Sequence, residues 1–190
     1  MPIRIAILGG PRCGKTTLIQ QLYVEMKIRG LSVGAESEYS TDYLRDKGMI
    51  ETISEQYGIY IGQAILEEKL NEFDYAITDY ATFVPYVYGR FMLGSKKRTK
   101  KEIEILKDLY YLALKDIPKY DYIFFVPREF GYLKDGVRWQ DEETAKSIDS
   151  AIMNFLDAEN VPYTIIEGAT KERAKKIIDI IKLNENQKEE

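Results

Sequence analysis

Short apolar segments alternate along the chain with longer segments of helical periodicity. Five segments rich in β-branched and aromatic residues are predicted to be strands: residues 3–8, 32–35, 75–78, 122–126 and 163–166. Between them, apolar residues recur at helical spacing, as at Leu18, Leu22 and Met26. Helices are expected over residues 15–28, 40–70 (broken near Gly48), 84–93, 100–115, 142–158 and 171–183. Strands that alternate with helices predict an α/β fold with a parallel sheet covered on both faces.

This pattern is continuous enough to predict one domain over residues 1–183, followed by a polar tail over 184–190. Two segments do not fit the alternation. Residues 94–101 carry a run of Lys and Arg, and residues 127–140 are rich in Gly and charged side chains. Both are candidates for mobile segments over a site, and we expect the second to be a lid.

The amino-acid composition limits the kinds of catalytic and binding site that the chain can form. The 190 residues include no histidine, which excludes the usual zinc sites and Ser-His-Asp catalysis and leaves Asp, Glu, Lys and Tyr for acid–base work. The single cysteine permits no intrachain disulfide and indicates a reducing, cytoplasmic location. A net charge of -4 argues against general binding of duplex nucleic acid. No secretory signal pattern and no apolar run long enough to span a membrane are found.

A phosphate-binding motif follows the first predicted strand. The segment Gly-Gly-Pro-Arg-Cys-Gly-Lys-Thr over residues 9–16 matches G-x-x-x-x-G-K-[ST] in full, between a buried strand and a helix. Its glycines permit backbone angles that direct successive N–H groups at one anion. The residues predicted to hold the nucleotide are Gly9, Gly10, Pro11, Arg12, Cys13, Gly14, Lys15, Thr16 and Thr17.

Within this segment the roles differ. Lys15 is expected to reach the β- and γ-phosphates of ATP, and the Thr16 hydroxyl to bind Mg²⁺. Arg12 either adds charge near the phosphates or points to solvent. Cys13 is interpreted as a small space-filling residue, since the chain has no histidine to activate its thiol.

Acidic residues stand where predicted strands end, at the sheet edge where α/β folds bind ligands. Asp79 follows the strand over 75–78 and is predicted to hold Mg²⁺ or to orient a substrate hydroxyl; a solvated loop aspartate is the alternative. Glu36 and Glu38 follow the second strand. Either could accept a substrate proton or bind a ribose, the other being a charge at a helix N-terminus. We favour Glu38.

Several of these segments together resemble one family. The run Glu38-Tyr-Ser-Thr-Asp-Tyr-Leu44 is similar to the E-Y-A-R-E-Y-L segment of the NadR-like (AAA_28-type) group of P-loop ATPases and kinases. So are the helix with Gln56 and Gln63, the segment Ile77-Thr-Asp79, and Asp135-Gly-Val-Arg138, which resembles a D-D-G-x-R lid segment. Two positions depart from the pattern: the family's arginine is Thr41 here, and the first aspartate of the lid motif is Lys134.

The resemblance implies a three-layer α/β/α P-loop fold, with a five-stranded sheet in the order 2-3-1-4-5 and a lid. It implies that Glu38 and Asp79 face substrate and metal and that Arg138 closes on the phosphates. Arg128 is assigned to the same lid by position only. If the family's arginine binds an acceptor group, Thr41 at that position predicts a different acceptor for this chain.

Four further features keep more than one interpretation. The basic residues at 96–101 either begin a solvated helix or contact a phosphate. Trp139 either packs the lid or stacks on a ligand. By resemblance to P-loop kinases, residues 168–170 and Arg173 lie near the adenine ring. An aromatic set after Asp79 either joins the core or stacks on a base; its members are Tyr80, Phe83, Tyr86, Tyr88 and Phe91.

These observations predict a phosphotransferase that uses Mg²⁺ and ATP and acts on a small nucleoside, nucleotide or nicotinamide riboside-like acceptor. One alternative is an ATPase switch or motor with a protein partner, although Asp79-Tyr80 lacks the second acidic residue of motor ATPases. Another is a polynucleotide 5′-end kinase, which the negative net charge disfavours. The sequence leaves the acceptor and the oligomeric state open.

Overall fold

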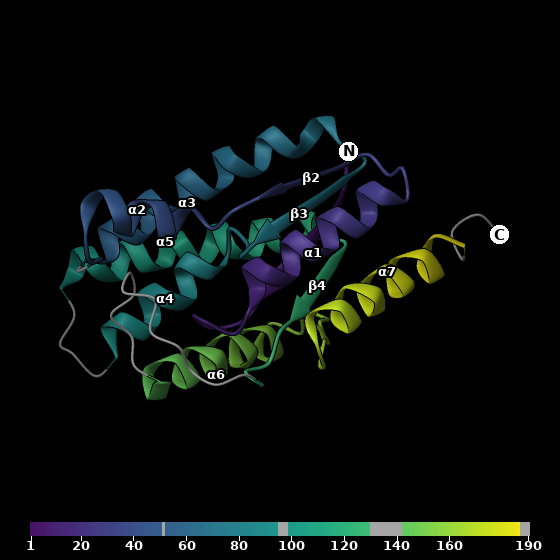
Figure 1. Ribbon diagram of the computed structural model, residues 1–190. Helices are drawn as coiled ribbons and strands as arrows, with labels where there is room; N and C mark the ends of the chain where they lie inside the picture. The colour runs from purple at the N-terminus through teal and green to yellow at the C-terminus, as the bar shows by residue number, and fades with distance from the viewer. Residues whose placement is uncertain (51, 95–98, 130–141, 187–190) are drawn as a thin grey trace.

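A five-stranded parallel sheet forms the centre of the fold in the computed structural model, which describes residues 1–50, 52–94, 99–129 and 142–186 (Figure 1). The strand order is β2-β3-β1-β4-β5, and every pairing is parallel. The predicted α/β class and strand order are therefore confirmed. The strands are β1 (Ile3–Leu8), β2 (Val33–Glu36), β3 (Tyr75–Asp79), β4 (Tyr122–Phe125) and β5 (Thr164–Ile165).

Helices cover both faces of this sheet. The described helices are α1 (Lys15–Ile28), α2 (Tyr39–Lys47), α3 (Ile53–Glu68), α4 (Val84–Leu93), α5 (Lys100–Asp116), α6 (Glu142–Ala158) and α7 (Thr170–Asn186), with short 3₁₀ turns η1 (Lys69–Glu72) and η2 (Ile117–Lys119). In Figure 1, α1 and α7 lie together in front of the sheet, and α3, α5 and α6 lie behind it. The expected break near Gly48 is present: α2 ends at Lys47, and Gly48 has a φ of 86°.

Alternation along the central strand explains why both faces need cover. Ile5 and Ile7 of β1 belong to the apolar cluster beneath α1 and α7, whereas Ala6 and Leu8 belong to the cluster beneath α4, α5 and α6. All four side chains are fully buried. A strand with two apolar faces is stable only between two layers, which is the usual setting of parallel sheets.

The strand register sets the location of the site. Ile7 pairs with Asp79, Leu8 pairs with Phe125, and Glu36 pairs with Thr78. Both acids are therefore the last residues of their strands and do not follow them, because the ladders run one residue further than the apolar pattern indicates. Since the strands are parallel, the loops after β1, β2, β3 and β4 all open at one edge of the sheet.

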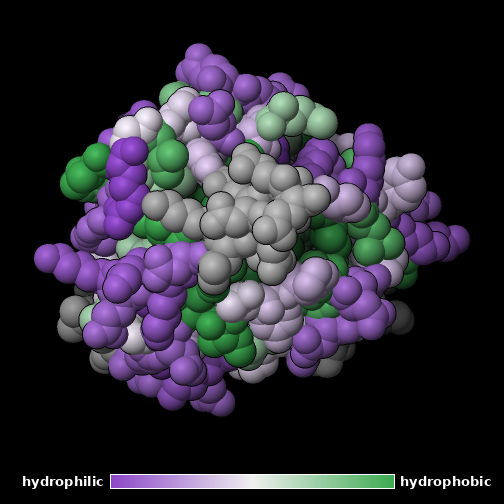
Figure 2. Space-filling view, turned by 90° about the vertical axis from the view of Figure 1, so that its right-hand side faces the viewer, coloured by the Kyte–Doolittle hydropathy of each residue, from purple (hydrophilic) through white to green (hydrophobic). Residues whose placement is uncertain are grey.

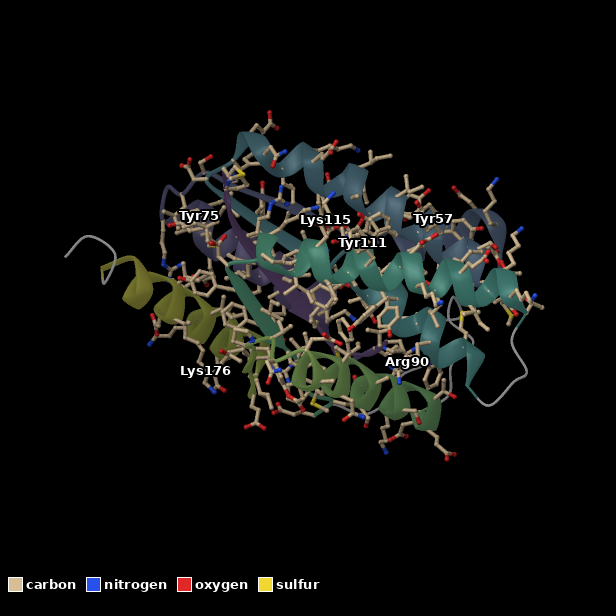
Figure 3. All side chains as sticks on the ribbon, turned by 180° about the vertical axis from the view of Figure 1, so that it is seen from behind. Tyr57, Tyr75, Arg90, Tyr111, Lys115 and Lys176 are labelled. Carbon is tan, nitrogen blue, oxygen red and sulfur yellow. The ribbon has the colours of Figure 1, made fainter. Side chains whose placement is uncertain are left out.

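Helix α3 has an unusual orientation. Its buried side includes Gln56, Gln63 and Glu67, each at most 4% exposed. Its outer side carries Tyr57, Ile61 and Ile65, which are 39%, 45% and 54% exposed. Figure 3 shows the outward side of this layer, with Tyr57 of α3 and Tyr111 of α5 labelled on it. Three polar side chains thus join Ile53 and Ile59 on the buried side of α3, and several apolar side chains face outward.

One face of the molecule is mostly polar. Seen from the right-hand side of Figure 1, hydrophilic residues dominate, with smaller hydrophobic patches between them (Figure 2). Among the described residues, no helix combines the length and the apolar character that crossing a bilayer requires. The hydrophobic effect therefore acts mainly through the two clusters on either side of the sheet.

Helix α1 offers a test of this packing. Leu22 is fully buried against the sheet, whereas Val24, two residues on, is 49% exposed. We expect Leu22→Ala to lower the free energy of unfolding by about 2–5 kcal/mol, through lost burial and a residual cavity. Urea unfolding followed by circular dichroism measures the change. Val24→Ala is the matched control and should cost much less; equal losses from the two variants would contradict the assigned orientation of α1.

Candidate functional site

Two glycines shape the loop between β1 and α1. Gly9 has a φ of 144° and Gly14 a φ of 92°, in the region that side-chain-bearing residues rarely adopt. A β-carbon on Gly9 would lie 2.7 Å from the Cys13 sulfur and 2.7 Å from the Val126 carbonyl oxygen. Gly14 is the N-cap of α1. The glycines of the motif are therefore required by backbone angle and, at Gly9, also by space.

The N-terminus of α1 is open toward this loop. Within the described chain, no side chain caps its first turn, and that turn contains no acidic residue. The first backbone N–H groups of a helix have no intrahelical acceptor, and the helix dipole places a partial positive charge there. An anion such as a phosphate satisfies both requirements.

Arginine side chains hold the loop through its carbonyl oxygens. Arg128 donates from Nη1 to the Pro11 carbonyl at 2.9 Å, and Arg173 donates from Nη1 to the Cys13 carbonyl at 3.5 Å. In a planar trans peptide, the C=O of one residue and the N–H of the next point in opposite directions. Fixing the carbonyls of Pro11 and Cys13 therefore fixes the N–H groups of Arg12 and Gly14 on the other side of the chain.

Two acids balance these buried arginines. Asp149 of α6 accepts a hydrogen bond from the Gly10 backbone N–H and pairs with Arg128 at 3.1 Å. Glu129 pairs with Arg173 at 2.9 Å and also accepts from the Gly168 backbone N–H, and these bonds lower the pKa of its carboxyl group. Sequence reasoning missed Asp149. The available signal was an acid on the apolar side of its helix, next to Ile148 and three residues before Ile152.

The central charged groups are packed together at the end of β3. The Thr16 hydroxyl donates to Asp79 at 2.7 Å, and the Lys15 ammonium lies 3.9 Å from the other Asp79 oxygen. The same ammonium donates to the Gly10 carbonyl at 3.2 Å and lies 4.6 Å from the centre of the Tyr80 ring. Lys15 and Asp79 are 4% and 2% exposed. The structure thus brings together Lys15, Thr16 and Asp79, as the sequence predicts.

The donor set fits magnesium. Mg²⁺ prefers oxygen ligands and is usually held by one or two protein groups together with substrate phosphates. A hydroxyl and a carboxylate, on Thr16 and Asp79, supply such oxygens next to the phosphate loop. Among the described residues, no group of three or more His, Cys, Asp or Glu side chains could hold a metal alone. Magnesium at this place would take its remaining ligands from water and from phosphate oxygens.

Glu38 lies between two hollows at the sheet edge. It lines the groove along the phosphate loop, together with Lys15, Thr16 and Asp79, and it also lines a second, apolar pocket. Its carboxylate accepts hydrogen bonds from the Ser40 hydroxyl and, at 3.3 Å, from the Thr41 hydroxyl. Glu36 instead lines a separate groove beside α1, with Thr16 and Asp79. The two candidate glutamates therefore line different hollows of the molecule.

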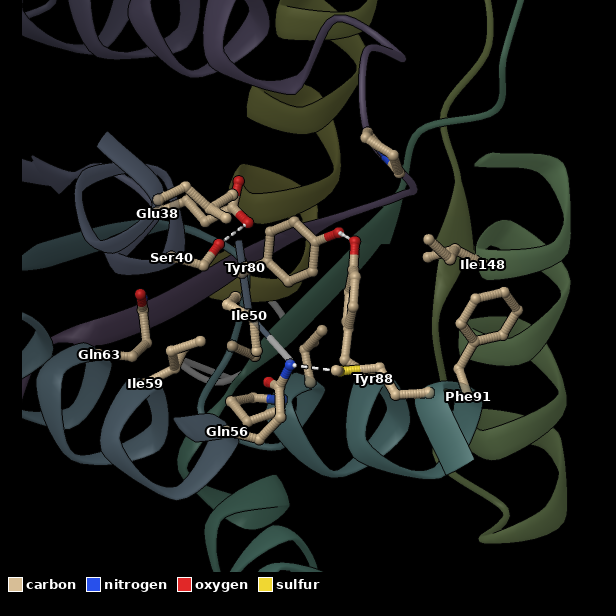
Figure 4. A pocket seen from close by; sticks show the side chains of 16 residues that line it. Glu38, Ser40, Ile50, Gln56, Ile59, Gln63, Tyr80, Tyr88, Phe91 and Ile148 are labelled. Carbon is tan, nitrogen blue, oxygen red and sulfur yellow. Dashed lines mark hydrogen bonds between the residues drawn. The ribbon is translucent and has the colours of Figure 1, made fainter. Parts of the chain in front are cut away.

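The apolar pocket is the hollow bounded by α2, α3, α4 and the turn after β3 (Figure 4). Its walls include Ile59, Val84, Tyr88, Phe91, Met92 and Ile148. Polar groups enter it at Glu38, Ser40, Gln56 and Gln63. The Tyr80 and Tyr88 hydroxyls lie 2.7 Å apart in a hydrogen bond within it. A mostly apolar cavity with a few placed polar groups is typical of a small-molecule site.

The aromatic set after Asp79 divides between core and pocket. Phe83 and Tyr86 are buried and contact the rings of Tyr120 and Phe155. Tyr80, Tyr88 and Phe91 line the pocket. Tyr80 has a φ of 77°, which is rare for a residue of its size and places it between the Lys15 ammonium and Tyr88. Such backbone outliers cluster at functional sites.

The remaining predicted site residues have the following outcomes. Arg12 lines the phosphate groove and has a φ of 65°. Cys13 is buried, and that burial raises the pKa of its thiol, which agrees with a space-filling role. Arg173 lies beneath the phosphate loop at 1% exposure, and its proximity to adenine stays a prediction. Arg128 reaches the loop through Pro11 and Asp149; its contact with a transferred phosphate also stays a prediction.

The structure describes only residues 127–129 of the predicted lid. Arg138, Lys134 and Trp139 lie outside the described residues, as do Lys96, Lys97 and Arg98 of the basic run. Lys100 and Lys101 of that run are exposed in the first turn of α5, after the Thr99 cap. No role of these residues is tested.

Comparison with known proteins supports the fold. A family model described as an AAA domain matches residues 4–173. No curated protein matches the chain in sequence. Two crystal structures of NadR protein are similar to it, one in complex with NAD and AMP-PNP (TM-score 0.71, 17% identity, 95% of this chain and 48% of that one) and one in complex with NR (TM-score 0.73, 18% identity, 94% and 50%). The chain thus spans about half the length of the NadR chains.

Thymidylate kinase from Candida albicans is also similar, with a TM-score of 0.67 at 15% identity over 97% of this chain and 93% of that one. Identities this low establish a shared fold and leave the activity open. Together with the family model, they confirm the resemblance to NadR-like P-loop proteins that the sequence motifs indicate.

The anchoring of the phosphate loop can be tested at Asp149. Asp149→Asn keeps an oxygen for the Gly10 N–H but removes the charge that faces Arg128. We expect a loss of about 1–3 kcal/mol in folding stability, because a buried charge loses its partner. We also expect nucleotide binding to weaken about tenfold as the loop becomes less ordered. Thermal unfolding and isothermal titration calorimetry measure the two effects.

Glu143→Gln is the matched control, because it makes the corresponding change at an exposed position of the same helix. It should leave both quantities unchanged. Wild-type affinity for nucleotide in Asp149→Asn would show that the ion pair does not order the loop.

Proposed function

The chain belongs to this AAA domain family, and from that premise we propose that it is a Mg-ATP-dependent phosphotransferase acting on a small nucleoside, nucleotide or nicotinamide riboside-like acceptor. The observation that carries the proposal is the position of Glu38, which lines both the phosphate groove and the apolar pocket. A carboxylate where the two hollows meet can contact a hydroxyl of a molecule in the pocket while a triphosphate occupies the loop.

The reaction uses the two hollows at the same time. With ATP on the loop and an acceptor in the pocket, the acceptor hydroxyl oxygen attacks the γ-phosphorus. The bond from that phosphorus to the β,γ-bridging oxygen breaks, and ADP leaves. Glu38 accepts the hydroxyl proton. Lys15 and the N–H groups of the loop stabilise the charge that spreads over the transferred group.

Thr16 and Asp79 would hold magnesium in this scheme. The ion would neutralise charge on the β- and γ-phosphate oxygens. Lys15 is held near Asp79 and the Gly10 carbonyl, next to the loop that would carry the phosphates. The apolar walls of the pocket exclude water, which favours transfer to the acceptor over hydrolysis. The single, buried Cys13 suits a reducing, cytoplasmic location.

The first experiment is an ADP-release assay with Mg-ATP and a panel of acceptors. The panel contains nucleosides, nucleoside monophosphates, nicotinamide riboside and a short 5′-hydroxyl oligonucleotide. Stimulation by one small molecule supports the proposal and identifies the acceptor class. Stimulation by the oligonucleotide alone would instead indicate a polynucleotide kinase. A slow background that no acceptor changes would overturn the proposal in favour of an ATPase switch with a protein partner. Lys15→Ala should abolish every signal and serves as the blank.

Glu38→Gln tests the role of the carboxylate. We expect kcat with the stimulating acceptor to fall about 10²–10⁴-fold, the usual contribution of a general base. The KM for ATP should change little, because the loop contacts are intact. Steady-state kinetics of ADP release measure both. Glu36→Gln is the matched comparison at the other candidate glutamate; a larger loss of kcat there than in Glu38→Gln would transfer the assignment to Glu36.

A further inference from the structure

A buried polar chain of hydrogen bonds connects two walls of the apolar pocket. At its centre is Glu67, near the end of α3 and 4% exposed. The Tyr120 hydroxyl donates to both of its carboxylate oxygens, at 3.1 Å and 2.9 Å. The Gln63 amide donates to it at 3.3 Å. Gln63 lines the pocket, whereas Glu67 and Tyr120 do not.

Each partner of Glu67 holds a different wall. The Gln63 amide oxygen accepts from the Tyr39 backbone N–H at 3.0 Å, one residue after Glu38. The Tyr120 hydroxyl accepts from the Thr82 backbone N–H at 2.7 Å, one residue after the pocket segment Tyr80–Ala81. Segments that follow β2 and β3 are therefore tied to the same carboxylate behind the pocket.

We propose that Glu67 is a positioning residue that holds the Glu38 wall and the Tyr80–Ala81 wall of the pocket in one arrangement. It does so through Gln63 on one side and Tyr120 on the other. Only the acceptor used in the kinetic test rests on the proposed function; the hydrogen-bond chain itself does not. In the described part of the molecule, the hydrogen bonds made by the side chains of Glu67, Gln63 and Tyr120 do not reach the phosphate loop.

The direction of the hydrogen bonds favours an ionised carboxylate at Glu67. Tyr120 donates its proton to Glu67, and its oxygen accepts from the Thr82 backbone N–H; the Thr82 hydroxyl also lies within hydrogen-bond distance of it, at 3.0 Å. Gln63 presents its NH₂ group to Glu67 because its oxygen accepts from Tyr39. A protonated Glu67 would add a donor where its neighbours are already arranged to donate. Protonation would therefore rearrange the hydrogen bonds of the Gln63 amide or of the Tyr120 hydroxyl, which can turn toward the Thr82 hydroxyl 3.0 Å away, and we expect the wall held by that group to loosen.

This ionisation falls near neutral pH. Burial raises the pKa of Glu67 to about 7, while the hydrogen bonds from Tyr120 and Gln63 and the charges of Arg4 and Lys119 oppose the increase. Arg4 of β1 lies 3.7 Å from the carboxylate. Tyr60 on α3 also interacts with Glu67, and its own pKa is raised to about 12, so it stays neutral. The arrangement of the pocket should therefore depend on pH around 7.

Glu67→Gln tests the proposal, since the neutral amide mimics the protonated form at every pH. We expect the KM for the acceptor to rise about five- to tenfold at pH 8, while the KM for ATP stays within about twofold of wild type. Wild-type enzyme should show the same rise in acceptor KM as the pH falls through 7, and the variant should show no such step. Glu68→Gln, at the next and exposed position of α3, is the matched control.

A measurement of folding stability distinguishes a positioning role of Glu67 from a purely structural one. A folded-state pKa above the ordinary value means that the folded protein binds more protons between pH 4.5 and 7, so stability falls as the pH rises through this range. Replacing Glu67 by the neutral glutamine removes this loss. At pH 8 the variant should unfold at the wild-type temperature or above it. A lower unfolding temperature with an unchanged acceptor KM would overturn the proposal, because Glu67 would then serve stability alone.

A measurement without any acceptor keeps the inference separate from the proposed function. In ¹⁵N NMR spectra, the amide signals of Tyr39 and Thr82 should shift together with a midpoint near pH 7. They should not shift in this way in Glu67→Gln. Tyr120→Phe removes only one arm, so the Thr82 signal should lose its dependence on pH while the Tyr39 signal keeps it. The two proposals fail on different results. If the acceptor panel gives no substrate, the proposed function is wrong. If the Tyr39 and Thr82 amides titrate independently of each other, this inference is wrong whatever the panel gives.

Discussion

The phosphate loop depends on hydrogen bonds to its carbonyl side from two buried arginines. A loop that must present several N–H groups to one anion cannot use them for its own folding, so its shape has to be fixed through other atoms. Arg128 and Arg173 bind the carbonyls of Pro11 and Cys13, and Asp149 and Glu129 balance their charge. Buried cations are costly without such partners. The site therefore extends well behind the atoms that would touch a nucleotide.

Much of this arrangement follows from local sequence. The central strand reads as apolar on both faces, and the structure places its alternate residues in two separate clusters. The phosphate loop is recognisable because glycine, lysine and threonine are needed at fixed spacing. Asp79 could be placed at the site because parallel strands bring their carboxyl ends to one edge. In each case, a single segment contains the information.

Other parts of the site depend on contacts between segments that are far apart in the sequence. The sequence of one segment alone does not predict those contacts. Asp149 is an ordinary acid on a helix until α6 docks against the Gly10 amide. Helix α3 gives a misleading pattern, because its exposed Ile61 and Ile65 resemble a core stripe and its buried Gln63 and Glu67 resemble a solvated one. Tertiary contacts override the local pattern there, as is common where polar groups serve a site.

The bond from Arg173 to Cys13 joins positions 160 residues apart in the chain. During synthesis, the glycine-rich motif leaves the ribosome early, and the helix that completes its support comes much later. The nascent chain thus carries the recognisable motif well before it can hold its binding shape. Nucleotide that binds only the finished loop would draw the late-arriving α7 into place through mass action. Docking of α7 behind the phosphate loop and binding of nucleotide to that loop would therefore stabilise each other.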